Sequence, residues 1–273
     1  MKIQIKDIDQ NPIDYVSYWT IPTGSTDKAQ FQLPILSGKI KGLPVEFDAC
    51  IVASDLQGVV LEKDNDLLLG QSLVEHLDII FEISFSHLNP KNVLVLLCGD
   101  NYANLIKRGE SGSPFQVWKA FSDTFGNVVG IAGNHDIIKD TSEYRVGNRT
   151  LLLKETIEIK GLKIAGLSGI IGNPSKPFRL TEIDYFKSLE KLLKQKPDIL
   201  LTHLSPADNE RNLQGDENLS QKLAKHDILS FCGHSNWNEF NPIRFEKANV
   251  LNADSKCYIF ENEKTATNSS HKI

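Results

Sequence analysis

Polar side chains that could bind a divalent metal recur at the ends of short apolar runs in this sequence. In chain order they are Asp55, Asp100, Asn134, His203 and His234. Carboxylates, amide oxygens and imidazoles are together the ligands that Mn, Fe, Zn and Mg accept in proteins. One such residue alone is as typical of a helix cap, a turn or a hydrogen-bonded histidine. Five in order, each after a run rich in Val, Ile and Leu, indicate a shared site.

The apolar runs predict the elements that would position these side chains. They span residues 47–55, 92–100, 127–136, 162–170, 197–206 and 226–235, and a further run follows at 249–260. Continuous apolar runs of this length are typical of strands buried on both faces. In open α/β sheets, ligands gather beyond the carboxyl ends of the strands. The candidate ligands are therefore expected to converge on one crevice.

Helical patterns lie between several of the runs. They span residues 66–85, 114–126 and 181–195. The last of these places apolar residues on one face and Lys and Glu on the other, which is typical of an amphipathic helix. Strands that alternate with helices predict an α/β fold. Residues 1–45 are harder to assign and are predicted to be an N-terminal extension or flap.

Composition and charge restrict the class of protein. The chain has 273 residues, of which 40% are hydrophobic and 24% charged, and its formal net charge is −5. This favours a single globular domain over residues 1–261, with a polar tail at 262–273 expected to be disordered. The negative net charge argues against a dedicated nucleic-acid binder. No secretory leader and no apolar stretch of membrane-spanning length is found, so a cytoplasmic protein without a membrane span is expected.

Cysteine usage agrees with this expectation. The four cysteines form no CxxC motif, and Cys50, Cys98 and Cys232 lie inside apolar runs. Buried, reduced thiols are therefore predicted.

The ordered polar residues resemble the motifs of the calcineurin-like metallophosphoesterases. That family carries the blocks D-x-H, G-D-x-x-D, G-N-H-D/E, a lone His and G-H-x-H. Here they stand as Asp55-Leu56-Gln57, Gly99-Asp100-Asn101-Tyr102-Ala103, Gly133-Asn134-His135-Asp136, His203 and Gly233-His234-Ser235-Asn236. The resemblance extends over residues 47–260. It implies an α/β fold in the form of a four-layer α/β/β/α sandwich of two mixed sheets, as in metallo-dependent phosphatases.

The resemblance also implies a reaction and a set of roles. The reaction is hydrolysis of a phosphomonoester or phosphodiester by hydroxide that two divalent metal ions activate. Asp100 would bridge the ions, and Asn134, His203 and His234 would complete one site. His135 would protonate the leaving oxygen.

The second metal site departs from the family pattern. Asp55 is retained, but Gln57 and Asn236 stand where the family has two histidines that bind the same ion. Amide oxygens are harder ligands than imidazole, so one interpretation is a site retuned toward Mn²⁺ or Mg²⁺, with Fe and Zn²⁺ as the other metals of the family. The other interpretation is a weak or empty site, which would leave a protein with one metal or a non-catalytic binding scaffold.

A second departure concerns the orientation of the catalytic histidine. Ala103 replaces the family's second Asp, so Asn104 or Asp136 is expected to orient His135. Arg108 and Arg179 are candidates for contact with the phosphate. The expected partner is thus a phosphate-ester substrate, and the sequence indicates no particular protein partner.

Overall fold

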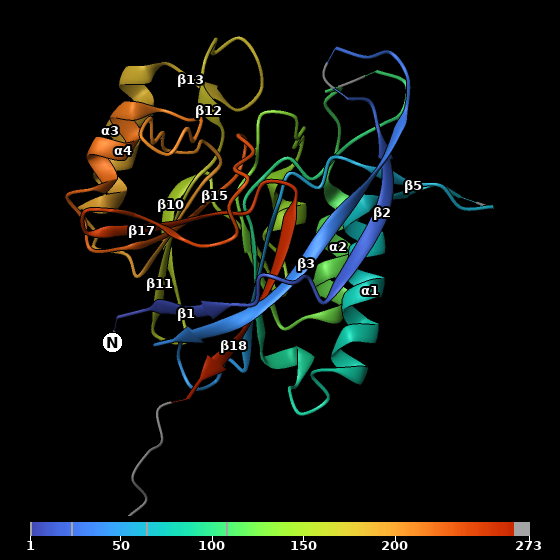
Figure 1. Ribbon diagram of the computed structural model, residues 1–273. Helices are drawn as coiled ribbons and strands as arrows, with labels where there is room; N and C mark the ends of the chain where they lie inside the picture. Colours follow the sequence, from blue (N-terminus) through green and yellow to red (C-terminus); the bar gives the residue numbers. More distant parts are fainter. Residues whose placement is uncertain (1, 23, 64, 108, 265–273) are drawn as a thin grey trace, which may run out of the picture.

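The computed structural model describes residues 2–22, 24–63, 65–107 and 109–264. Two β-sheets pack face to face, and a pair of helices covers the outer face of each (Figure 1). The first sheet has the order β6-β5-β2-β3-β18-β4-β7-β8-β9, with β1 also paired to β3, and the second has the order β10-β11-β14-β15-β17-β16. Both sheets contain parallel and antiparallel pairs. The predicted four-layer α/β/β/α sandwich of two mixed sheets is confirmed.

The elements have the following bounds. The first sheet contains β1 (Gln4–Ile8), β2 (Asp14–Thr20), β3 (Ala29–Lys41), β4 (Ala49–Ser54), β5 (Val59–Val60), β6 (Leu67–Leu68), β7 (Val93–Leu97), β8 (Asn127–Gly130), β9 (Arg149–Leu151) and β18 (Lys256–Glu263). The second contains β10 (Lys154–Ile159), β11 (Leu162–Leu167), β14 (Ile199–Thr202), β15 (Leu229–Cys232), β16 (Ile243–Phe245) and β17 (Ala248–Asn252). The helices are α1 (Leu69–Ile83), α2 (Phe115–Thr124), α3 (Glu182–Leu193) and α4 (Glu217–Leu223), and β12 (Ile170–Ile171) pairs with β13 (Arg179–Leu180).

The core consists of three apolar layers. One lies between the first sheet and helices α1 and α2, one between the two sheets, and one between the second sheet and helices α3 and α4. Strand β7 serves two of them, because Val93 and Val95 face the helices while Leu94 and Leu96 face the other sheet. Alternate residues of a strand point to opposite faces, so a strand in the middle of such a sandwich must be apolar throughout. This explains the continuous runs in the sequence.

Parallel pairing brings the carboxyl ends of the central strands to a common edge. In the first sheet, β4, β7 and β8 are parallel neighbours. In the second, β14, β15 and β17 are parallel neighbours. The loops that follow these strands carry the candidate ligands, so two separate sheets contribute to one site.

The two ends of the chain differ in part from expectation. Residues 4–41 form three strands of the first sheet, and β3 pairs in parallel with β18 through Ile35 and Cys257. Residues 262 and 263 close β18, so the predicted disordered tail does not begin at 262; residues 265–273, to which the rest of that prediction applies, lie outside the described residues. The run at 249–260 is two strands, because Ser255 turns the chain with a φ of 54°.

Helices α1, α2 and α3 lie where the sequence pattern predicted them, whereas α4 was not predicted. Helix α3 begins after Thr181, whose hydroxyl accepts a hydrogen bond from the Asp184 N–H and so caps the first turn. Gly70 has a packing role in α1, because a Cβ at this position would lie 2.4 Å from Val117 Cγ1 of α2. The two helices can therefore approach closely at this point.

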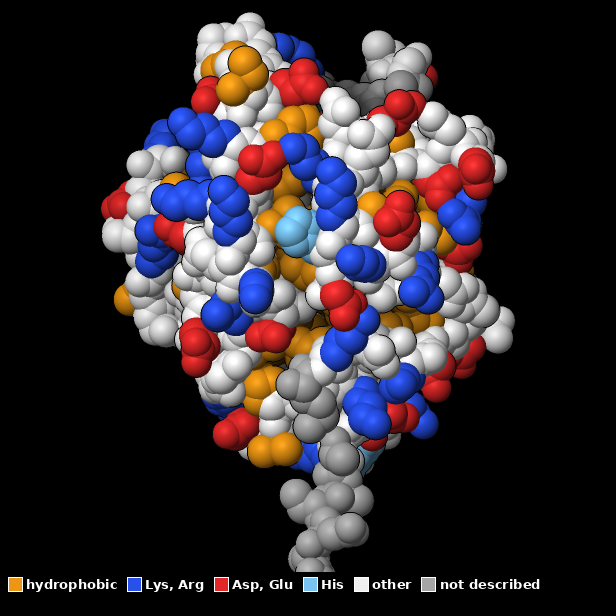
Figure 2. Space-filling view, turned by 90° about the vertical axis from the view of Figure 1, so that its left-hand side faces the viewer, with side chains coloured by type: hydrophobic (Ala, Val, Ile, Leu, Met, Phe, Trp, Pro, Cys, Tyr) orange, Lys and Arg blue, Asp and Glu red, His pale blue; other side chains and the backbone are white. Residues whose placement is uncertain are grey.

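The outer surface over α3 and α4 carries both signs of charge. Figure 2 shows Lys and Arg side chains interspersed with Asp and Glu over this face. Mixed charge of this kind is typical of a solvated protein surface. Within the described residues, no helix has the length and apolar character that crossing a bilayer requires. All four cysteines are buried and free, as predicted for three of them.

Candidate metal centre

Three of the predicted site residues have an unusual backbone conformation. Asp55, Asp100 and His234 have φ angles of 53°, 53° and 69°. This left-handed region costs a residue with a Cβ roughly 1–2 kcal/mol, and residues held there gather at functional sites. Each of them follows a central strand, β4, β7 or β15. The surrounding contacts must hold these loops in place.

The loops hold one another through backbone donors and side-chain acceptors. The Asp55 N–H donates to the Gly99 carbonyl at 3.0 Å. The His234 N–H donates to Asp55 Oδ2 at 2.9 Å, and the His135 N–H donates to Asp100 Oδ1 at 2.7 Å. Loops from four strands and from both sheets are thus locked together. Their positions depend on each other rather than on local sequence.

Asp136 is the anchor beneath this network. Its carboxylate accepts hydrogen bonds from the N–H groups of Asp100, Asn101 and Gly133, each at 2.9 Å. Burial, assisted by the charge of Asp100, raises the pKa of Asp136 to about 7. The oxygens of Asp136 therefore position backbone. These three donors assign Asp136 to the backbone, and its predicted role in orienting the His135 ring stays a prediction.

The His135 ring is held by a backbone carbonyl. Its Nδ1 lies 2.7 Å from the Gly109 oxygen, so Nδ1 carries the hydrogen and donates it to that carbonyl. Asn104 does not contact the ring either: its Oδ1 accepts from the N–H groups of Ile106 and Lys107. Asn104 thereby shapes the loop that presents Gly109. Asn104 therefore acts on the His135 ring only indirectly, through this loop.

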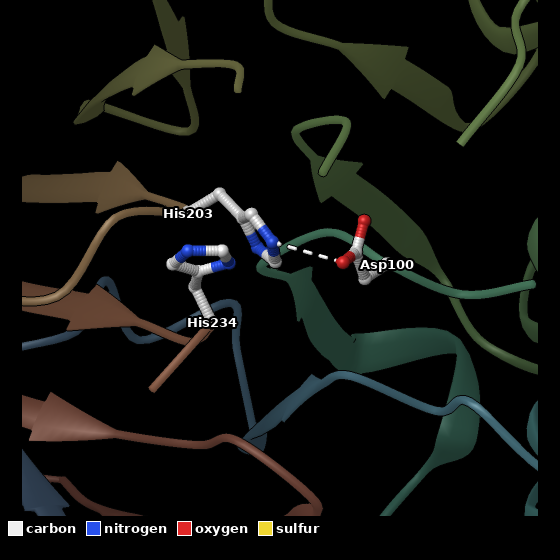
Figure 3. A group of neighbouring side chains, drawn as sticks. All are labelled: Asp100, His203 and His234. Carbon is white, nitrogen blue, oxygen red and sulfur yellow. Dashed lines mark ion pairs between the residues drawn. The ribbon is translucent and has the colours of Figure 1, made fainter. Parts of the chain in front are cut away.

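Three of the predicted ligands converge on one point, and a fourth, Asn134, lies on the loop after β8. Ligand atoms of Asp100, His203 and His234 lie within 4.8 Å of one another (Figure 3). Asn134 Oδ1 is buried and has no hydrogen-bond partner. A buried lone pair without a donor is costly, and a cation among these atoms removes the cost. One carboxylate, one amide oxygen and two imidazoles therefore fit a divalent metal ion.

The two histidines of this group are in opposite protonation states. His203 Nδ1 donates to the Cys98 carbonyl at 2.8 Å, and Nε2 lies 3.2 Å from Asp100 Oδ2. Burial lowers the pKa of His203, but the nearby carboxylates of Asp100 and Asp55 outweigh it and raise the pKa to about 10. Burial and the charge of His203 lower the pKa of His234 to about 4. The metal-free group thus holds one proton, on His203.

Metal binding is therefore expected to release close to one proton at pH 8. The His203 proton must leave before Nε2 can bind a cation, whereas His234 is already neutral. Below about pH 10 the apparent affinity should then rise about tenfold per pH unit. Calorimetric titration with Mn²⁺ in buffers of different ionisation enthalpy counts the protons. Release of none would mean that His203 is neutral without metal.

The predicted ligands of the other site are placed differently. Gln57 directs its Nε2 to Asp100 Oδ2 at 3.1 Å. Asn236 is exposed and directs its Nδ2 to Asp254 Oδ1 at 3.3 Å. Both amides thus present nitrogen to a carboxylate. Burial, followed by the charge of Asp254, raises the pKa of Asp55 well above its usual range.

Sequence reasoning missed Asp254 and Lys256. Asp254 follows β17 and forms a parallel bridge with Ser54, the residue before Asp55. The Lys256 ammonium is buried and donates to the carbonyls of Trp237 at 2.9 Å and Asp254 at 3.1 Å. Burial lowers the pKa of Lys256, and the charge of Asp254 opposes this. The available signal was the group of polar residues Asn252, Asp254, Ser255 and Lys256, which lies inside the stretch 249–260 that the pattern treats as one run.

Comparison with known proteins agrees with this geometry. The sequence model of the calcineurin-like phosphoesterases matches residues 51–237. The chain belongs to the calcineurin-like phosphoesterase family. No curated protein matches it. Among solved structures, it is similar to the sulfate thiohydrolase SoxB of Thermus thermophilus, in complex with glycerol, at 13% identity and a TM-score of 0.39, over 68% of this chain and 37% of that one. The chain thus spans little more than a third of that protein's length.

Membership supports a metal-dependent hydrolase, and this calcineurin-like phosphoesterase has a cleft beside the metal centre. The cleft encloses about 670 Å³, and Asp55, Gln57 and His135 lie at its base. Strands β2 and β3 and the segments next to them supply one wall, which includes Tyr18 and Phe31. The remaining lining residues are Thr20, Ile21, Pro22, Tyr102, Ala103, Asn104, Gly109, Glu110 and Ser255. The N-terminal residues therefore shape the site of this phosphoesterase.

Of the two predicted phosphate contacts, Arg179 and Arg108, the structure describes only Arg179. Arg179 lies in β13, and its Nη1 donates to the Asn134 carbonyl at 3.4 Å. The guanidinium is thus directly beside a candidate ligand. Arg108 lies outside the described residues.

Proposed function

We propose that this protein is a metal-dependent phosphoesterase. The observation that supports this most directly is the buried Asn134 Oδ1, which has no hydrogen-bond partner, together with the cluster of Asp100, His203 and His234. A buried oxygen of this kind has no stabilising partner unless a cation binds. The family match supplies the reaction class, and His135 lines the cleft.

Asp100, Asn134, His203 and His234 would hold the ion, with Mn²⁺ as the favoured metal. A divalent ion at this position would acidify water and withdraw charge from the phosphate. The resemblance also implies a second ion, held by Asp55 with Gln57 and Asn236.

His135, with a hydrogen on both ring nitrogens, would donate its Nε2 proton to the leaving oxygen and keep the hydrogen on Nδ1. The Gly109 carbonyl accepts from Nδ1–H and so fixes the ring, and both residues line the cleft. A fixed ring brings Nε2 to the reacting oxygen without reorganisation, which is what general acid catalysis needs. Arg179, held beside Asn134, is the proposed contact for the phosphate oxygens.

The wall of the cleft favours a leaving group with a planar ring. Tyr18 and Phe31 lie with ring centroids 6.1 Å apart, and Tyr102 belongs to the same lining. Aromatic side chains attract other rings by stacking and apolar contact. Phe31 is 42% exposed, so part of its ring is available to a substrate.

Phe31→Ala is expected to raise the KM for an aryl phosphate about five- to tenfold and to leave kcat within about twofold. A ring contact contributes roughly 0.5–1.5 kcal/mol, and Phe31 does not touch the metal ligands. Steady-state kinetics with p-nitrophenyl phosphate measure both constants. Tyr15→Ala is the matched control, because Tyr15 is equally exposed on β2 but does not line the cleft. An unchanged KM would remove Phe31 from the substrate site.

The function itself is tested by turnover of a monoester and a diester. Purified protein loaded with Mn²⁺ is given p-nitrophenyl phosphate and bis(p-nitrophenyl) phosphate, and release of p-nitrophenol is followed. We expect turnover of at least one. Bound metal with no turnover of either, also after replacement by Mg²⁺, Fe²⁺ or Zn²⁺, would instead favour a non-catalytic binding scaffold.

A further inference from the structure

The two halves of the family's metal centre differ in this chain in how their polar atoms are satisfied. On one side, Asn134 Oδ1 is buried without a hydrogen-bond partner. On the other side, the chain's own donors already occupy the carboxylates. This difference bears on how many ions the centre binds.

Gln57 contacts Asp100, the carboxylate that would bridge two ions in the family pattern. Its Nε2 donates to Asp100 Oδ2 at 3.1 Å. An amide nitrogen is a hydrogen-bond donor and offers no lone pair to a metal. The reverse orientation would set Oε1 against the carboxylate, two acceptors at close range, and would be stable only with a cation between them. The two orientations therefore predict different metal contents.

Asp55 is satisfied in the same way. Its Oδ2 accepts from the Ser54 hydroxyl at 2.7 Å and from the His234 N–H at 2.9 Å. In the family pattern this carboxylate would belong to the second ion. Here it ties the loop after β15 to the loop after β4.

Asn236 and Lys256 supply further hydrogen-bond donors on this side of the centre, around Asp254. Asn236 Nδ2 and the Ser255 hydroxyl both donate to Asp254 Oδ1. The buried Lys256 ammonium lies beside Asp254, where it donates to the Asp254 carbonyl. A lysine that is only 4% exposed is rare unless its charge is compensated, and Asp254 provides a compensating charge. This part of the centre thus already contains a cation of the chain's own.

We propose that this phosphoesterase binds a single divalent cation, at Asp100, Asn134, His203 and His234, and that donors of the chain replace the second ion. The exchange of two histidines for Gln57 and Asn236 then has one explanation. Each amide supplies N–H groups to a carboxylate that would otherwise need a metal. The proposal rests on the proposed function only for the identity of the retained ligands.

The experiment counts ions without reference to turnover. Metal-free protein is dialysed against Mn²⁺, bound Mn is measured by elemental analysis, and electron paramagnetic resonance distinguishes an isolated ion from an exchange-coupled pair. We expect one Mn per chain and the uncoupled signal for the unaltered protein. Two Mn per chain with a coupled signal would overturn the proposal, and so would no bound Mn.

A double variant tests the explanation. Gln57→His together with Asn236→His is expected to raise the content to two Mn per chain and to produce the coupled signal. Gln30→His together with Asn218→His adds the same side chains at exposed positions in different layers, on β3 and α4, and is expected to leave the content at one. If the first variant also stays at one, the amides are not what excludes the second ion. One Mn without turnover would overturn the proposed function and leave this proposal standing.

Discussion

Replacement of His135 by Ala is expected to lower kcat about 10²- to 10⁴-fold and to leave the Mn content unchanged. The ring is the only part of the residue that the variant removes, and a positioned proton donor contributes a factor of this size. The contact between His135 and Asp100 uses the backbone N–H, which alanine keeps. Turnover of p-nitrophenyl phosphate and elemental analysis of the same sample are the measurements.

The control for this variant is an exposed histidine elsewhere. His87 pairs with Glu261 on the surface, and His87→Ala should retain full activity. If His135→Ala also retained full activity, His135 would not be the proton donor. If it lost both metal and activity, the residue would act on the metal centre instead.

Replacement of Asp136 by Ala is expected to lower the free energy of unfolding by at least about 3 kcal/mol. Three buried N–H groups would lose their acceptor, and each unsatisfied donor costs roughly 1–3 kcal/mol. The loops after β7 and β8 would lose their common anchor, including the left-handed Asp100. Urea unfolding measures the effect as a lower midpoint at an unchanged slope.

An exposed aspartate provides the comparison for Asp136. Asp123 pairs with Lys119 on the surface of α2, and both side chains are more than half exposed. Because exposed ion pairs contribute little, Asp123→Ala should cost less than about 1 kcal/mol. Equal losses for the two variants would show that Asp136 is not an anchor, and the network beneath the site would need another explanation.

The two variants test residues with different roles, one proposed to act on the substrate and one that holds the backbone in place. In the proposed function His135 acts on the substrate, and its ring is positioned by Gly109 in a loop that Asn104 shapes. Asp136 acts on the backbone that carries Asp100. The first variant should therefore change rate without stability, and the second should change stability first. A single measurement of activity would not separate them.

The sequence by itself determined the α/β class and the edge of the sheets at which the candidate site lies, whereas the four-layer form followed from the resemblance to the family. Continuous apolar runs require strands buried on both faces, and polar residues at their carboxyl ends require a site at that edge of the sheets. Both properties are local, because they depend on neighbouring residues along the chain. The strand that ends before Asp100 and the one that ends before His203 could thus be placed without knowledge of their partners. The helix pattern at 181–195 was readable for the same reason.

Only the tertiary structure decided how the site residues are used. Gln57 meets Asp100 43 positions away, and His234 meets Asp55 179 positions away. Whether an amide offers its nitrogen or its oxygen depends on such a partner, and no local pattern encodes it. Asp254 was missed because the left-handed Ser255, which separates two strands, lies in a stretch that the sequence pattern assigned to one run at 249–260. The ligands could be listed from the sequence, but the hydrogen bonds that leave some of them free for a cation and occupy the others arise from the packing of distant loops.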